Sequence, residues 1–246
     1  MIHIDQQGPV TLLTIDRQQR RNALDHEALE QLLAGLATAH AARSRVLVLT
    51  GAGGHFCAGA DLTTVEDGAF LDLLHELLEG IRTAPFPSIA AIDGAALGLG
   101  SQLAVACDLR VSTPTATFGV PAAKLGLMTD QWTMRRLAGF IGQGPARAMC
   151  LAAETFTGAD VHRLGFVQRL AEPDQLLDET LRWAATIATL APLTIAGFKV
   201  GLNEAEGLDD WTPTYRAAFE AAWASADLQE GLKAFAERRP PAFEGR

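Results

Sequence analysis

Two glycine-bearing turns constrain the fold of this chain more than any other feature. The first covers residues 51–61 (GAGGHFCAGAD) and the second residues 93–102 (DGAALGLGSQ). Each follows a short apolar run rich in β-forming residues, 45–50 or 88–93, and each leads into a helical pattern. A strand that turns tightly into a helix leaves backbone N–H groups without helical partners. Two such turns side by side would aim two N–H donors at one point, as in an oxyanion hole.

The rest of the chain alternates predicted strands with helices and then becomes helical. The pattern predicts a hairpin over 2–5 and 10–16, helices over 29–36 and 70–81, a short helix up to Cys107, and strands over 108–112 and 115–119. From Asp130 onward it predicts almost only helix. This order indicates an α/β fold with a right-handed βαβ core. We expect residues 1–190 to form the core and residues 191–246 a small helical subdomain.

Composition excludes several classes of function. The net charge of −9 argues against broad nucleic-acid binding, so an anionic ligand would need a local basic patch. No run of about 18 apolar residues and no signal-peptide pattern occurs, which predicts a cytoplasmic protein without membrane insertion. The three cysteines are too few and too scattered for a disulfide framework or a zinc site, and no metal-ligand spacing occurs.

Both turns resemble the motifs of the crotonase superfamily, also called the enoyl-CoA hydratase/isomerase family. Residues 56–62 (FCAGADL) resemble its first motif and residues 94–100 (GAALGLG) its second, and the resemblance extends over nearly the whole chain. It implies a crotonase (ClpP-like) spiral of ββα repeats, followed by helices that form a homotrimer or a hexamer of two trimers. It also implies that the backbone N–H groups of Ala58 and Leu99 form the oxyanion hole. Leu99 replaces a frequent glycine, which narrows the pocket but leaves the backbone donor in place.

The acid and base positions depart from the family pattern. In the family's hydratases, one glutamate lies three residues beyond the second donor, and another follows the proline of a Phe-Gly-x-Pro-Glu sequence. Here these positions hold Gln102 and Ala122. Hydration needs groups that take and return a proton near the working pH, and neither an amide nor a methyl group does so. We therefore expect that efficient hydration by the family route is absent.

Asp130 is the one carboxylate in this region that could substitute. Dienoyl-CoA isomerases and 4-chlorobenzoyl-CoA dehalogenase resemble this chain in carrying an aspartate at the corresponding place, where it serves as a base or a nucleophile. The competing interpretation is that Thr129 or Asp130 caps a helix over 131–137. The dehalogenase has an aromatic residue where this chain has Ala122, which counts against a dehalogenase-like reaction.

Coenzyme A carries phosphates, and arginine binds phosphate through two parallel hydrogen bonds. Basic residues precede Ala23 in the sequence, as they do near the phosphates in the family. The resemblance assigns contacts with the CoA part of the ligand to Arg20, Arg21, Ala23, Ala60, Asp61, Leu62 and Leu97, and to Phe235 and Arg238, which often come from a neighbouring subunit. No separate cofactor is implied, since coenzyme A belongs to the substrate or ligand.

Three further side chains lie in or near the motifs. His55 belongs to the first turn and His75 to the 70–81 helix, which walls the acyl pocket in relatives. We expect both to be exposed histidines without a catalytic role. Cys57 has no base nearby, and small residues are usual there in the family, so we expect it to pack rather than react.

These patterns favour a non-catalytic protein that binds fatty acyl-CoA in lipid metabolism. Residues 124–132 and the C-terminal sequence resemble actinobacterial hydratase paralogues that lack the catalytic glutamates. The alternative is an active enoyl-CoA isomerase, hydrolase or dehalogenase-like enzyme that uses Asp130. A third hypothesis, a purely structural subunit, predicts no affinity for CoA.

Overall fold

A computed structural model describes residues 1–61, 68–125, 127–204, 213–214, 217, 221 and 224–246. Its main sheet has the order β1-β2-β3-β4-β6-β9. The strands are β1 (Ile2–Gln7), β2 (Val10–Ile15), β3 (Val46–Gly51), β4 (Ser88–Ile92), β6 (Leu109–Ser112) and β9 (Arg169–Leu170). The first pair is antiparallel and the other pairs are parallel. A smaller sheet joins β5 (Ala95–Leu97), β7 (Thr117–Gly119) and β8 (Thr155–Thr157).

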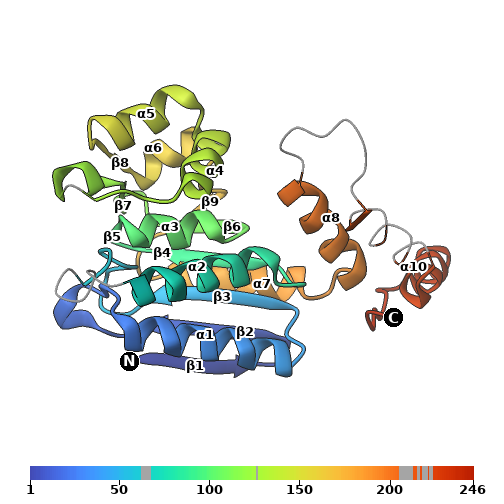
Figure 1. Cartoon of the computed structure of the whole chain (residues 1–246). Helices are drawn as coiled ribbons and strands as arrows, with labels where there is room; N and C mark the ends of the chain where they lie inside the picture. Colours follow the sequence, from blue (N-terminus) through green and yellow to red (C-terminus); the bar gives the residue numbers. More distant parts are fainter. Residues whose placement is uncertain (62–67, 126, 205–212, 215–216, 218–220, 222–223) are drawn as a thin grey trace.

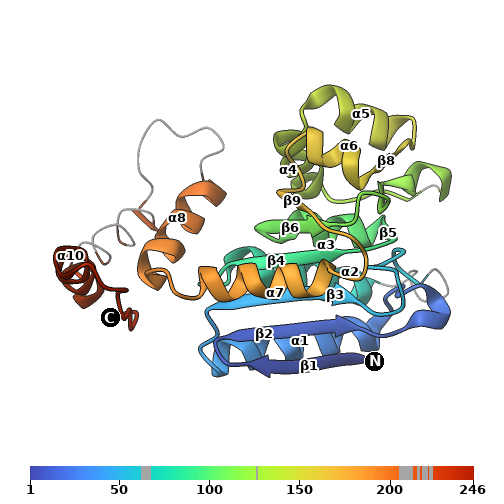
Figure 2. The ribbon, with the colours of Figure 1, turned by 180° about the vertical axis from the view of Figure 1, so that it is seen from behind.

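Helices cover both faces of the main sheet. The helices α1 (His26–Ala41) and α2 (Gly68–Thr83) lie on one face and α7 (Leu176–Ile187) on the other (Figures 1 and 2). The remaining elements are α3 (Leu99–Ala106), α4 (Gln131–Ile141), α5 (Gln143–Leu151), α6 (Gly158–Arg163), α8 (Pro192–Glu204), α10 (Ala226–Glu237) and the short 3-10 helices η1 (Gln18–Arg20) and η2 (Pro121–Leu125). The predicted α/β fold is therefore confirmed.

The residues of β3 explain how the sheet carries two cores. Successive side chains of a strand point to opposite faces. Leu47 and Leu49 accordingly join the core beneath α1 and α2, while Val46 and Val48 join the core beneath α7. A strand buried on both faces is a continuous apolar run, which is the pattern that the sequence shows at this place.

Two predictions about secondary structure were incomplete. The region after Asp130 contains β8 and β9 as well as helices, and β5 lies within the second turn. These strands have three, two and three residues. Runs that short do not show a period of two, so only pairing with distant strands defines them.

The C-terminal helices α8 and α10 extend away from the body of the molecule as an arm (Figures 1 and 2). Lys199 fastens α8 to the body, because its Nζ donates to Ile81 O and Phe86 O, both at 3.0 Å, and to Asp108 Oδ2 at 2.8 Å. Burial lowers the pKa of Lys199. The boundary at residue 190 stays a prediction.

Among the described residues, no single helix is long and apolar enough to cross a membrane. The bent pair Leu176–Ile187 and Pro192–Glu204 meets that criterion jointly, by length and composition alone, with a 108° angle at the break.

Candidate functional site

The two glycine-bearing turns lie side by side. Cys57 N–H donates to Ala95 O at 2.8 Å, and Leu97 N–H donates to Cys57 O at 3.0 Å. The backbones approach so closely that a Cβ on Gly100 would lie 2.1 Å from Cys57 O. A glycine is therefore required where α3 passes the first turn, and the predicted adjacency of the two turns is confirmed.

The opposite edge of the first turn pairs with Leu24. Leu24 N–H donates to Gly59 O at 3.0 Å, and Asp61 N–H donates to Leu24 O at 2.7 Å. These two bonds flank Ala60, so its own N–H points away from Leu24, since successive peptide groups of an extended segment alternate in direction. No described residue accepts a hydrogen bond from the Ala60 N–H. Ala60 lines a cavity, which leaves this amide available to a ligand.

The predicted role of Ala58 as the first donor is wrong. Its N–H donates to Arg21 O at 3.0 Å and is committed to the protein. The available donor is Ala60, which the resemblance assigns only to the CoA contacts. The sequence Gly59-Ala60-Asp61 predicts the turn. Only the pairing of this segment with Leu24 shows which backbone N–H has no acceptor among the described residues.

Leu99 has the second backbone N–H that lacks an acceptor among the described residues, at the beginning of α3. The first N–H groups of a helix have no intrahelical acceptor, and no described residue accepts from Leu99 N–H. The N-cap Gly98 takes the unusual backbone angles, φ 54° and ψ −112°. Leu99 has no positive φ, so a leucine fits this place without backbone strain. Its side chain is buried and lines the same cavity as Ala60.

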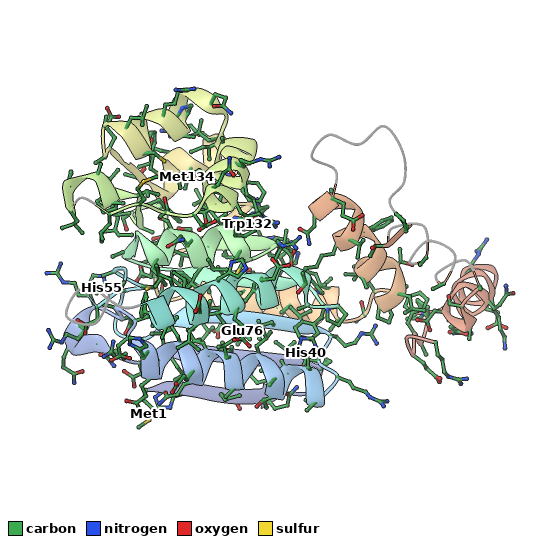
Figure 3. All side chains as sticks on the ribbon, in the orientation of Figure 1. Met1, His40, His55, Glu76, Trp132 and Met134 are labelled. Atoms are coloured by element: carbon green, nitrogen blue, oxygen red, sulfur yellow. The ribbon has the colours of Figure 1, made fainter. Side chains whose placement is uncertain are left out.

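The cavity has a volume of about 690 Å³, within the usual range for small-molecule sites. Most of its wall is apolar. One side comes from α2 and the other from η2, the segment after it and the first turn of α4, whose Trp132 is labelled in Figure 3. These two sides form an apolar wall with the large side chains of Phe70, Leu71, Leu74, Leu78, Leu125, Leu127, Met128 and Trp132.

Gln102, Ala122 and Asp130 all line this cavity, as the sequence suggested. Gln102 Nε2 donates to Asp130 Oδ2 at 2.8 Å. Asp130 also caps α4, because its Oδ1 accepts Thr133 N–H at 2.8 Å and its Oδ2 accepts the Thr133 hydroxyl at 2.6 Å. The capping role is confirmed, and the same carboxylate binds the side chain at position 102, which the resemblance assigns as the first acid–base position.

Glu79 is a cavity residue that the sequence did not single out. Arg82 Nε donates to Glu79 Oε2 at 2.8 Å and holds the pKa of that carboxyl below its usual value. The spacing of three residues between Glu79 and Arg82 on one helix is the sequence feature that could have predicted this ion pair. His75 lines the cavity too and is exposed, as expected.

The arginine-bearing loop over residues 17–23 lies next to the first turn, and some of its side chains hold the loop and the turn together. Arg17 binds Ala23 O and the Asp25 carboxylate. The buried Asn22 donates through Nδ2 to Ala52 O at 2.9 Å and to His55 O at 2.6 Å, which ties the loop to the turn. The sequence did not predict this role for Asn22.

The predicted CoA contacts are only partly brought together. Arg20 and Arg21 are exposed on the loop, Ala23 and Leu97 are half-buried, and Asp61 is buried. Arg238 directly follows α10, at the end of the arm and away from the turns (Figures 1 and 2). Leu62 lies outside the described residues, and so does the side chain of Phe235.

The first turn also holds His55 and Cys57. His55, labelled in Figure 3, is not a purely solvated histidine, because its Nδ1 accepts Ala95 N–H at 3.2 Å. Cys57 is buried, and burial raises the pKa of its thiol to about 12, which fits a packing role. Within the described part of the chain, no group of three or more His, Cys, Asp or Glu side chains could hold a metal ion.

Comparison with known proteins identifies the family and agrees with the fold. The model of the enoyl-CoA hydratase/isomerase family matches residues 5–246. The chain is 41% identical over 246 residues to the probable enoyl-CoA hydratase echA6 of Mycobacterium tuberculosis (strain CDC 1551 / Oshkosh), with full coverage of both chains. It is 33% identical to the 2,3-dehydroadipyl-CoA hydratase of Escherichia coli (strain K12), covering 99% of this chain and 98% of the other. A crystal structure of an enoyl-CoA hydratase from Bacillus anthracis superposes with a TM-score of 0.90 at 28% identity, covering 100% of this chain and 99% of that one.

Proposed function

The chain belongs to the enoyl-CoA hydratase/isomerase family, and we propose that it binds a fatty acyl-CoA thioester in the cavity between α2, α3 and the segment before α4. The Ala60 and Leu99 amides would bind the thioester carbonyl oxygen, and the apolar wall would take the acyl chain. One observation carries the proposal: both amides line one apolar cavity, and no described residue accepts from either. Amides in such a place gain a partner when a ligand supplies an oxygen.

We propose binding without glutamate-dependent hydration. Each missing acid–base group costs about 10²- to 10⁴-fold in rate, and this chain lacks both family glutamates. Among the described cavity residues the carboxylates are Glu79, which Arg82 holds, and Asp130, which Thr133 and Gln102 hold. Both carboxylates are therefore engaged by neighbouring side chains, and neither stands at the Gln102 or Ala122 position, where the family's hydratases carry their glutamates.

The family resemblance and the exposed side chains also suggest how the protein binds the CoA phosphates and how it assembles. The exposed Arg20 and Arg21 would bind CoA phosphates beside the first turn, and Arg238 would act from a neighbouring subunit. The arm exposes Phe198 (61%) and Leu202 (78%), which suits burial in a homotrimer or hexamer. We expect the protein to act in the cytoplasm, in fatty-acid metabolism, and without a separate cofactor.

Calorimetry and a hydration assay test the proposal together. Dodecanoyl-CoA should bind at micromolar or tighter affinity and more tightly than free CoA, because its chain buries apolar surface. Crotonyl-CoA and trans-2-dodecenoyl-CoA should show no hydration at rates ordinary for glutamate-bearing relatives. Absence of binding, or hydration at such rates, would contradict the proposal.

A second candidate function is favoured by one observation: Asp130 lines the cavity and reaches the side chain at position 102. It would then act as a base in an isomerase, or as a nucleophile in a hydrolase or dehalogenase-like enzyme. Any turnover found should fall by at least about 100-fold in Asp130→Asn. Unchanged turnover would discard this candidate.

A further inference from the structure

The side-chain amide of Gln102 has a fixed orientation. Its nitrogen lies 2.8 Å from Asp130 Oδ2, and Asp130 also accepts from the backbone N–H and the hydroxyl of Thr133. A carboxylate that caps a helix accepts hydrogen bonds and donates none, so the group that faces it has to be the amide nitrogen. The two amide ends are therefore distinguished by their chemistry, and the oxygen is directed away from Asp130.

The Gln102 oxygen opens on the cavity. Gln102 is 6% exposed, belongs to a helix whose residues are all buried, and lines the cavity. Within the described residues, no group donates a hydrogen bond to Oε1. Oε1 is also not completely buried, so a ligand in the cavity can reach it. The site therefore presents a hydrogen-bond acceptor where a hydratase would present a glutamate.

The geometry of α3 places the Gln102 side chain relative to a ligand bound at Leu99. Gln102 lies three residues after Leu99, and side chains at that spacing share a helix face, with Cβ atoms about 5–6 Å apart. A thioester whose oxygen is bound by Leu99 N–H would place its first acyl carbons beside position 102. Ala122, on the cavity wall, offers no polar group that could compete.

We propose that Gln102, oriented by Asp130, selects acyl thioesters that carry a hydrogen-bond donor close to the thioester, such as a 3-hydroxyl group. This inference rests on the proposed function, because it needs the thioester at the Ala60 and Leu99 amides. A 3-hydroxyacyl chain gives Oε1 a donor. A saturated or 2-enoyl chain gives it none and displaces its water, so that an acceptor is left unpaired in a mostly apolar site.

Calorimetry with chains of equal length tests the inference on the full-length protein. The ligands are dodecanoyl-CoA, trans-2-dodecenoyl-CoA and the two enantiomers of 3-hydroxydodecanoyl-CoA. One hydroxy enantiomer should bind about 2- to 10-fold more tightly than the saturated chain, the range that one hydrogen bond supports. In Gln102→Leu this ratio should fall to about one while dodecanoyl-CoA still binds.

Two further variants distinguish the orientation of the Gln102 amide by Asp130 from a general effect of mutation on the protein. Asp130→Asn keeps a helix cap but can face the Gln102 amide with either its oxygen or its nitrogen, so the preference should shrink without vanishing. Gln143→Leu changes an exposed glutamine outside the cavity and should keep the full preference.

The outcomes are distinguishable from failure of the proposed function. Equal affinity of the wild-type protein for all four thioesters would overturn the inference and leave the proposed function standing. A hydroxyl preference that persists in Gln102→Leu would overturn the role of Gln102. If none of the thioesters binds, the proposed function fails and the inference fails with it.

Discussion

Gln102 Nε2 and Asp130 Oδ2 lie 2.8 Å apart, across 28 residues of sequence. The pair joins α3 to the N-terminus of α4 on the wall of the cavity. It replaces a proton-shuttling glutamate with an amide held by a capping carboxylate. The predictions below follow from this pair and from the buried groups around it.

Restoring a glutamate at position 102 should make stability depend on pH. Gln102→Glu replaces the amide that binds Asp130 with a second carboxylate. Repulsion between the two carboxylates raises the pKa of one of them above its value in the unfolded chain. The folded state then binds a proton that the unfolded state releases, so stability is lost as the pH rises through the raised pKa. A pKa raised by one corresponds to about 1.4 kcal/mol of stability. Thermal unfolding from pH 4 to pH 8 should show a fall beyond that of wild type, and Gln102→Met should not show it.

Restoring both family glutamates should create hydration. Gln102→Glu combined with Ala122→Glu supplies a proton donor and a proton acceptor on the wall of one cavity. Crotonyl-CoA hydration should rise at least about 100-fold over wild type, and each single variant should gain much less. A wild-type protein that already matches the double variant would contradict the account of the missing acid–base groups.

The buried thiols should be inert in the native protein. Burial raises the pKa of Cys57 and of Cys107 to about 12. At pH 8 both groups are therefore held in the thiol form, and the thiolate is the reactive form. A disulfide reagent followed by mass spectrometry should leave both unmodified until denaturant is added. Rapid labelling of Cys57 in the folded state would contradict its packing role.

The same thiols predict a loss of stability in alkali. Their folded pKa values lie above the ordinary 9.0, so the stabilising difference is present below about pH 9 and is lost as the pH rises toward 12. Urea unfolding at pH 8 and pH 10 should show lower stability at pH 10. Cys57→Ala should reduce that difference.

The attachment of the arm should depend on Lys199. Lys199→Met removes the ammonium and leaves the Asp108 carboxylate and the Ile81 and Phe86 carbonyls without this donor. Losing one partner of a buried ion pair costs about 3–5 kcal/mol. Urea unfolding should show this loss. Adding Asp108→Asn should recover part of it, and a double variant less stable than Lys199→Met would contradict the pairing.

Local sequence predicted the parts of the fold that carry long or repeated patterns. The apolar run of β3 and the spacing of α2 identify both elements, and the paired glycine turns identify the site. The assignment of Ala58 as the first donor, which the resemblance implies, is wrong, because the available amide depends on which backbone pairs with Leu24. The Gln102–Asp130 bond and the short strand β9 depend on tertiary contacts that no local pattern specifies.

The central claim is that the Ala60 and Leu99 amides bind a thioester oxygen in a cavity without the usual glutamates. A crystal structure of the complex with dodecanoyl-CoA tests it most directly. The account predicts the thioester oxygen within about 3.2 Å of both Ala60 N and Leu99 N, with Ala58 N still bonded to Arg21 O. A thioester oxygen bound elsewhere, or a glutamate side chain beside the second and third acyl carbons, would contradict it.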